Sequence, residues 1–243
     1  MWTRADGRFV DPYRPTIQQS GFRTPAELEA DRQRHLAAVR RAFAELDVFI
    51  FTLGLTECWT IAADGAALPL APGVAGGVYD PARYTLVNLS VNDVVADMTR
   101  FIDGLRAINP AATIILTVSP VPLSATALDR HVLVSTTYSK AVLRVAAEQL
   151  AASIEAVHYF PAYEIVTGQF ARGQYFADDL RSVTAAGVNH VMSLFFTHAA
   201  ERGTGPAADQ GTPVLLSRTR LKKALKVMCD EELLLLGVDA RGR

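Results

Sequence analysis

The strongest constraint on the fold is a short, almost purely apolar run. Residues 48–53 read Val-Phe-Ile-Phe-Thr-Leu, with Asp47 before them and Gly54 after them. A run of this length, rich in branched and aromatic residues, is typical of a strand that is covered on both faces, and such strands are usually parallel and central. Functional sites of α/β proteins form at the carboxyl ends of parallel strands. Gly54, Thr56 and Glu57 follow this run directly, so we expect the site there.

Two further apolar runs predict the rest of a parallel sheet. They cover residues 112–118 and about 156–160, and helical periodicity fills 90–109 and about 136–152 between the three runs. A strand, a helix and a second strand form a right-handed crossover with both strands parallel. Further helices are predicted over 24–46 and from about 184 to 200. The prediction is one α/β domain over residues 1–200, with a parallel sheet and helices on both faces.

The first helix carries clear start signals. Thr24 is placed to be its N-cap, Pro25 takes the first helical position, and Glu27 lies three residues after the cap. Apolar side chains at helical spacing, among them Leu36, predict a buried face, while arginines such as Arg32 fall mostly outside it and are expected in solvent. Residues 1–24 and 60–90, which are rich in glycine and proline, show no periodicity and are predicted to be irregular surface chain.

Composition narrows the function classes. Of the 243 residues half are apolar and a fifth are charged, and the formal net charge is −1, so we expect neither nucleic acid nor a membrane surface as a partner. Two cysteines and an amino end without an apolar signal segment favour a cytoplasmic protein. The five histidines form no pair at metal-ligand spacing, so no metal and no other cofactor is predicted.

The carboxyl end reads as a separate element. Residues 201–213 have the composition of a linker, and residues 214–243 predict an amphipathic helix with an apolar stripe of Leu221, Leu225 and Met228. We expect this stripe to pack on the domain or on a second copy of the chain, which would make a homo-oligomer. A basic helix that binds another partner, so that the chain is an interaction module, is the alternative.

Four segments together resemble one protein family. They are Phe51-Thr-Leu-Gly-Leu-Thr-Glu57, Thr117-Val-Ser-Pro-Val-Pro-Leu123, Tyr159-Phe-Pro-Ala-Tyr-Glu-Ile165 and Phe176-Ala-Asp-Asp-Leu-Arg181. In their order and spacing, over roughly residues 45–200, the chain resembles the GSCFA family, a branch of the SGNH (GDSL-like) hydrolase superfamily. That resemblance implies a three-layer SGNH-hydrolase-like fold. It also implies an esterase or acyltransferase that acts on acyl esters, such as carbohydrate O-acetyl groups.

The resemblance also implies roles for particular residues. Thr56 stands where the superfamily places an asparagine that binds the oxyanion, and the Gly54 amide would be a second donor. Asp179 matches the aspartate of Asp-x-x-His, but Ser182 occupies the histidine position, and a serine cannot act as a general base near neutral pH. His190 is the nearest substitute, although the periodicity of its helix predicts that it faces solvent.

The attacking serine is the second departure from the family. The resemblance implies a Gly-Ser-Cys-Phe strand before the rest of the domain, and no such sequence occurs before Val48. The chain is therefore expected to be an amino-terminally incomplete enzyme or a non-catalytic member that binds its partners without chemistry. Ser119, at the end of the second strand, is an internal alternative, although a turn role is more usual there. Cys58 is expected to be a core residue rather than a nucleophile.

Overall fold

The computed structural model describes residues 1–200, with side chains up to His198. The chain divides into two compact units, residues 1–163 and residues from 164 onward, and each is described by itself. The predicted linker at 201–213 and the predicted helix at 214–243 lie outside the described residues. Within the described part, no helix has the length and apolar character needed to cross a membrane.

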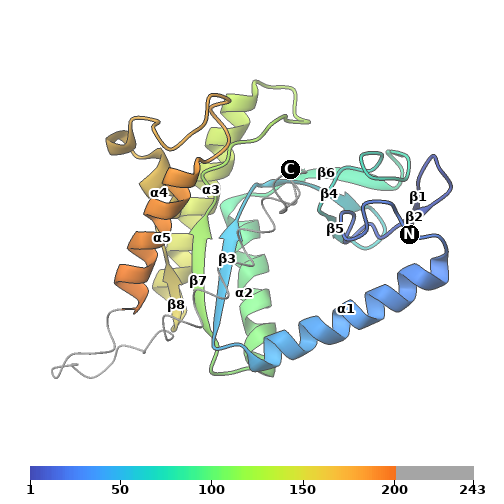
Figure 1. Ribbon diagram of the computed structural model, residues 1–243, viewed down its shortest axis with the longest axis horizontal. Helices are drawn as coiled ribbons and strands as arrows, with labels where there is room; N and C mark the ends of the chain where they lie inside the picture. The colour runs from blue at the N-terminus through green and yellow to red at the C-terminus, as the bar shows by residue number, and fades with distance from the viewer. Residues whose placement is uncertain (201–243) are drawn as a thin grey trace. The chain divides into compact units, whose positions relative to one another are not determined.

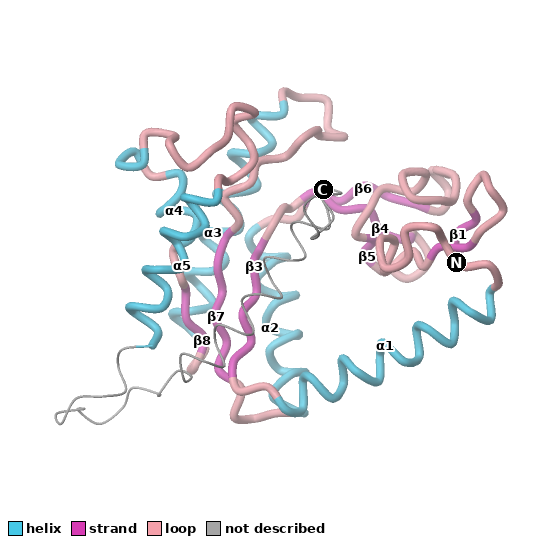
Figure 2. The backbone as a smooth tube through the Cα atoms, viewed as in Figure 1, coloured by secondary structure: helices cyan, strands magenta, loops and turns pink. Residues whose placement is uncertain are grey.

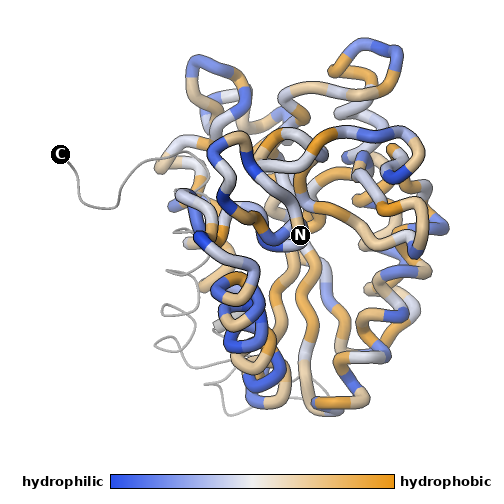
Figure 3. Tube along the Cα trace, turned by 90° about the vertical axis from the view of Figure 1, so that its right-hand side faces the viewer, coloured by the Kyte–Doolittle hydropathy of each residue, from blue (hydrophilic) through white to orange (hydrophobic). Residues whose placement is uncertain are grey.

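A parallel sheet forms the centre of the 1–163 unit. Its strands are β3 (Val48–Leu53), β7 (Thr113–Val118) and β8 (Val157–Tyr159), in the order β3-β7-β8 (Figure 1). Both pairs are parallel, with Leu53 opposite Val118. Strands β3 and β7 consist mostly of hydrophobic residues, and the strands at the centre of Figure 3 are largely orange. The predicted α/β fold, a parallel sheet flanked by helices, is confirmed, but β3 lies at an edge of the sheet among the described residues rather than at its centre.

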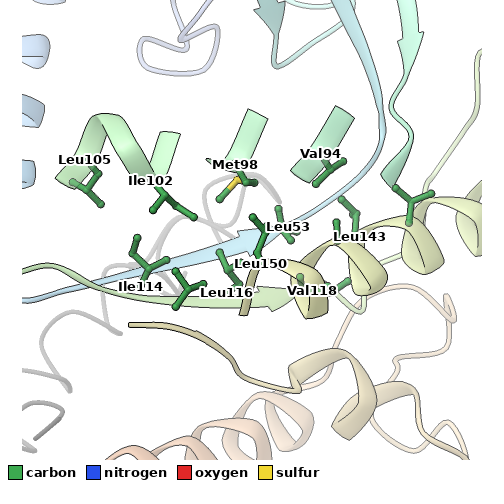
Figure 4. Close-up of a cluster of buried hydrophobic side chains, with 14 of the residues drawn as sticks. Leu53, Val94, Met98, Ile102, Leu105, Ile114, Leu116, Val118, Leu143 and Leu150 are labelled. Carbon is green, nitrogen blue, oxygen red and sulfur yellow. The ribbon is translucent and has the colours of Figure 1, made fainter. Parts of the chain in front are cut away.

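Two helices cover one face of this sheet. They are α2 (Val91–Ile108) and α3 (Val132–Ser153), and both contribute to one buried cluster with β3, β7 and β8 (Figure 4). Ile102, Ile114 and Leu116 are fully buried there. Alternate residues of β7 and every third or fourth residue of α2 reach the cluster, which is the spacing that strand and helix geometry require. The apolar periodicity of both helices in the sequence therefore identified this core.

Local capping residues define where the helices begin. The Ser90 hydroxyl accepts a hydrogen bond from the Asp93 amide, and the Asp93 carboxylate accepts one from the Ser90 amide, which closes a capping box on α2. In α1 (Pro25–Glu45), Thr24 accepts from the Glu27 amide at 3.1 Å. Helix α3 begins at Val132, four residues before the predicted start, because His131 accepts a hydrogen bond from the Leu133 amide and caps it.

Two small antiparallel sheets interrupt the irregular chain predicted for residues 1–24 and 60–90. Strands β1 (Trp2–Thr3) and β2 (Phe9–Val10) pair together, and β4 (Glu57–Ile61) lies between β5 (Ala67–Leu68) and β6 (Tyr84–Asn88) (Figure 2). Trp2, Val10, Leu68 and Tyr84 form a second buried cluster. These strands were not predicted because strands of two to five residues show no measurable periodicity.

Helix α1 differs from its predicted faces in two places. Leu36, expected in the buried face, is 45% exposed, whereas Phe43 near the end of the helix packs edge-on against Phe49 of β3. Arg32, expected in solvent, makes an ion pair at 2.9 Å with Asp11, which is 1% exposed. Periodicity reports only which residues are apolar on a helix, and it cannot show that an amino-terminal segment presents a buried carboxylate to the arginine.

The second unit is mostly helical in its described part. Helix α4 (Ala162–Thr167) spans the boundary between the units, and a 3-10 turn at Gln169–Ala171 follows. An isolated bridge joins Phe176 to Val183, after which α5 (Ala185–Ala200) begins at the predicted position. The loop that this bridge closes contains Asp179 and Ser182.

Candidate functional site

Buried polar groups collect where β3 ends. Thr56 is fully buried, its amide donates to the Ser139 hydroxyl at 2.9 Å, and its own hydroxyl donates to the Asn88 side-chain oxygen at 2.7 Å. A threonine hydroxyl has one hydrogen to donate. Because Asn88 already accepts that hydrogen, the Thr56 hydroxyl has a structural role in this arrangement. It is not free to donate to an oxyanion.

The next residue of α3 supplies a buried cation to the same loop. Lys140 is 2% exposed, and its Nζ donates to the Gly54 carbonyl oxygen at 2.9 Å. Burial lowers the pKa of Lys140 to about 8 from its usual value near 10.5. Ser139 and Lys140 thus hold the Thr56 amide and the Gly54 carbonyl from adjacent positions of one helix. We call Gly54, Thr56, Asn88, Ser139 and Lys140 the Thr56 cluster.

Glu57 heads a directional chain of hydrogen bonds. Its Oε1 accepts from the Thr126 hydroxyl at 2.6 Å, which uses the only hydrogen that Thr126 can donate. The 2.9 Å contact between the Thr126 and Ser135 hydroxyls therefore has Ser135 as donor. Arg130 Nε donates to Ser135 at 2.8 Å. The chain runs from a guanidinium through two hydroxyls to a carboxylate, and such chains strengthen cooperatively.

Two backbone amides beside the cluster have no partner among the residues the structure describes. They belong to Gly54 and Leu55, which are both exposed, with Leu55 at 45%. A Cβ built on Gly54 would meet no atom within 4 Å, so the space beside it is open. The loop therefore presents two backbone donors to solvent, and the oxyanion role expected for the Gly54 amide stays a prediction.

Ser119 and Cys58 lie near the cluster without being activated. The Ser119 hydroxyl accepts a hydrogen bond from the Val121 amide at 3.2 Å, and the Ser119 amide donates to the Leu53 carbonyl, which is the turn role expected from sequence. Burial, aided by the Asp97 carboxylate, raises the pKa of the Cys58 thiol. A raised pKa keeps that thiol protonated near neutral pH and disfavours nucleophilic chemistry.

Asp179 and His190 belong to the other unit and are not joined by a hydrogen bond there. The Asp179 carboxylate accepts from the Ser182 hydroxyl at 2.5 Å and from the amides of Arg181 and Ser182, and these bonds lower the pKa of Asp179. In the family pattern, the Asp179 carboxylate would accept a hydrogen bond from a histidine and so orient it. In this chain Ser182 makes a hydrogen bond to that carboxylate instead. His190 is exposed, as its helix periodicity predicted, and its ring stacks on Tyr175 at 5.4 Å between centroids.

Lys140 and Ser139 are site residues that our reading of the sequence missed. Both are buried on α3, where Val142, Leu143 and Ala146 face the core. Ser139 precedes Leu143 and Ala146 by four and seven residues, so helical spacing placed it on the apolar face. Two adjacent polar residues, Ser139 and Lys140, beside an apolar helix face were the sequence signal that could have identified them as site residues. Within residues 1–198, no three His, Cys, Asp or Glu side chains come together in a way that could hold a metal ion.

Ser139→Ala is expected to lower the free energy of unfolding by about 1–3 kcal/mol, the cost of a buried donor without its partner. The variant removes the Ser139 hydroxyl, the one acceptor that the described residues offer to the buried Thr56 amide. Urea denaturation would measure the change. The matched control is Ser153→Ala, since Ser153 is exposed at the end of α3 and bonds only to a carbonyl of its own helix. Equal losses in the two variants would contradict the structural role of the Ser139 bond.

The family model described as "GSCFA family" matches residues 6–195, which is more than half of the chain. The match spans the Thr56 cluster, the Glu57 chain and the Asp179 loop. No curated protein matches the sequence.

Proposed function

This chain belongs to the GSCFA family, and from that premise we propose that it forms the acyl-binding part of an ester hydrolase or acyltransferase site. The Gly54–Glu57 loop would bind the acyl group of a small-molecule or carbohydrate ester. The attacking hydroxyl would arrive on a further strand added to the free edge of β3. The serine oxygen would bond to the acyl carbon while the alcohol leaves with the serine proton, and water or an acceptor alcohol would then take the acyl group.

The observation that carries this proposal is the unpaired edge of β3. The Asp47 and Leu53 carbonyls accept from Thr113 and Ser119, so odd-numbered residues bond toward β7. Alternate residues of a parallel strand bond to opposite sides, so the backbone groups of Val48, Ile50 and Thr52 face the other edge. None of the described residues pairs with them. An unpaired, apolar edge strand is a template for adding another strand.

The added strand would bring its last residues to the carboxyl end of β3, where the candidate site lies. A strand parallel to β3 would finish at the same end of the sheet, beside Gly54 and Leu55. Its last residues would therefore lie near the free amides of this loop, which are donors suited to a developing oxyanion. Three described serine and cysteine residues near this end do not compete as nucleophile: Ser119 has a turn bond, Cys58 has a raised pKa, and Ser139 is fully buried against the Thr56 amide.

The test compares the chain as printed with a chain extended by whatever residues its gene encodes in frame before Met1. On a chromogenic acetate ester, the printed chain is expected to show no turnover above solvent background. An extension that contains Gly-Ser-Cys-Phe is expected to be active, and a Ser→Ala change in that sequence should abolish the activity. Turnover by the printed chain that is lost in Ser119→Ala would sink the proposal and identify Ser119 as the nucleophile.

A non-catalytic, ligand-binding role is the second candidate, and the Asp179 loop favours it. Ser182 makes hydrogen bonds to the Asp179 carboxylate, which in the family pattern would orient a histidine. None of the described histidines is hydrogen-bonded to Asp179. If the extended chain binds an acetylated sugar but does not hydrolyse it, this second candidate is the correct one. Ser182→His in the extended chain would then be expected to introduce measurable ester turnover by placing an imidazole beside Asp179.

A further inference from the structure

We propose that Lys140 is a positioning residue that strengthens the Leu55 amide as a hydrogen-bond donor to a negatively charged ligand oxygen. This inference rests on the proposed function only for the identity of that oxygen, which would be a carboxylate or the oxyanion of an acyl group. The interaction itself requires only the geometry of the loop.

A single peptide unit joins the Gly54 carbonyl to the Leu55 amide. The Gly54 carbonyl accepts from Lys140 Nζ at 2.9 Å, on the side where α3 lies. The chain contains no cis peptide bond, and in a planar trans peptide the N–H points opposite to the carbonyl. The Leu55 N–H therefore points away from Lys140. Leu55 is 45% exposed, and no acceptor for its N–H occurs among the described residues.

A cation at the carbonyl changes the amide on the other side of the same peptide. A hydrogen bond accepted by a carbonyl polarises the peptide unit and makes its N–H a stronger donor, and the effect grows when the bond is charge-assisted. The neighbouring Ser139 accepts a hydrogen bond from the Thr56 amide at 2.9 Å. Two adjacent residues of α3 thus fix both ends of the short loop that carries Leu55.

No carboxylate neutralises the Lys140 charge within the described residues. Glu57, the acidic residue closest in sequence to the loop, accepts instead from Thr126 and Ala127. Arg144, one turn further along α3, pairs with Glu148 at 2.8 Å. Arg130 faces Ser135 and the ring of Tyr138. The Lys140 charge therefore acts on the Gly54 carbonyl without a neighbouring carboxylate to offset it. Burial is the cause that lowers the pKa of Lys140 to about 8.

The sign of the pH dependence follows from that value. Below about pH 8 the ammonium donates a charge-assisted bond, and above it the neutral amine donates a weaker one. The Leu55 donor should therefore weaken as pH rises. Stability should change in the opposite direction, because a lysine with a lowered pKa in the folded state stabilises the fold progressively as pH rises from about 8 toward about 10.5.

The experiment follows the Leu55 amide by NMR in the full chain. Its ¹⁵N shift is expected to titrate with a midpoint near pH 8. Sodium acetate at constant ionic strength is the probe, since acetate keeps one negative charge throughout. Acetate affinity, read from the Leu55 amide, is expected to fall about fivefold from about pH 6.5 to about pH 9.5, the difference between charge-assisted and neutral hydrogen bonds.

Two variants separate this role from a structural one. Lys140→Met is expected to abolish the Leu55 titration and to weaken acetate binding at neutral pH about fivefold, while its thermal midpoint rises because a buried charge is removed. Lys140→Arg keeps the positive charge at every pH tested, so its affinity for acetate should not change between about pH 6.5 and about pH 9.5. Arg100→Met, which removes an exposed charge on α2, is the matched control and should leave both readouts unchanged.

A Leu55 shift that stays flat in the unmodified chain overturns the inference, even if a Lys140 variant fails to fold. So does a titration that persists in Lys140→Met, or acetate that shifts other amides and not Leu55. Failure of the proposed function is a separate outcome. An extended chain without ester turnover, together with a Leu55 amide that titrates and binds acetate, would contradict the esterase and leave the role of Lys140 intact.

Discussion

Asp11→Ala is expected to lower the free energy of unfolding by about 3–5 kcal/mol, the usual cost of removing one partner of a buried ion pair. Asp11 is 1% exposed and is bonded through both carboxylate oxygens, to Arg14 at 2.9 Å and to Arg32 at 2.9 and 3.0 Å. Removing it leaves two arginines without this carboxylate. The ion pair between Arg14 and Asp31 at 2.8 Å would then remain as a link between the amino-terminal segment and α1.

The pH dependence of the same group provides a second measurement. Burial raises the pKa of Asp11, but hydrogen bonds from Arg32 and Arg14 outweigh burial and leave the pKa lowered. A lowered carboxyl pKa means that this contribution is present above the pKa of an unfolded aspartate, about 3.9, and is lost as pH falls through the lower folded value. The stability difference between the parent and Asp11→Ala should therefore shrink in strong acid.

The control for Asp11 is Asp6→Ala. Asp6 is exposed and pairs with Arg4 at 3.4 Å, and an exposed pair of this kind contributes at most about 1 kcal/mol. Urea denaturation of both variants at neutral pH would measure the contrast. If the two variants lose the same stability, the carboxylate of Asp11 is not buried between arginines as described.

Leu116→Ala is expected to cost about 2–5 kcal/mol, because it removes a fully buried side chain and leaves a cavity. Leu116 lies in the middle of β7, between β3 and β8, and contributes to the cluster with α2 and α3 (Figure 4). Chemical denaturation would measure the loss. The same substitution at Leu36, which is 45% exposed on α1, is expected to stay within about 1 kcal/mol. A loss at Leu116 no larger than at Leu36 would contradict the core.

Much of the fold could be predicted because its signals are local. The apolar runs at β3 and β7 and the periodicity of α2 report burial directly, and Thr24 caps α1 through the Glu27 amide as predicted. The four-residue error at the start of α3 has a local cause too, since His131 is an unusual cap. The small sheets of residues 1–10 and 57–88 were not predicted, because their strands are too short to show a periodic pattern.

The binding residues predicted for the site lie close together at one end of the sheet, and their role in a site stays a prediction. Gly54, Thr56, Glu57 and Ser119 all lie near the carboxyl ends of β3 and β7, as expected for parallel strands. The role expected for the Thr56 hydroxyl changed, because Asn88 accepts its only hydrogen, and Asn88 comes from a strand that our sequence reading did not identify. Whether Asp179 acts with these residues stays a prediction.

The sequence by itself determined the class of the fold, the family and the end of the sheet where polar residues gather. All three depend on the order of residue types along the chain, and a strand or helix expresses that order through its own repeat. Only the tertiary structure decided that β3 has an unpaired edge, that Arg32 meets a buried carboxylate and that Lys140 reaches the Gly54 carbonyl. These depend on which groups meet across the fold, and in this chain 86 residues separate Gly54 from Lys140.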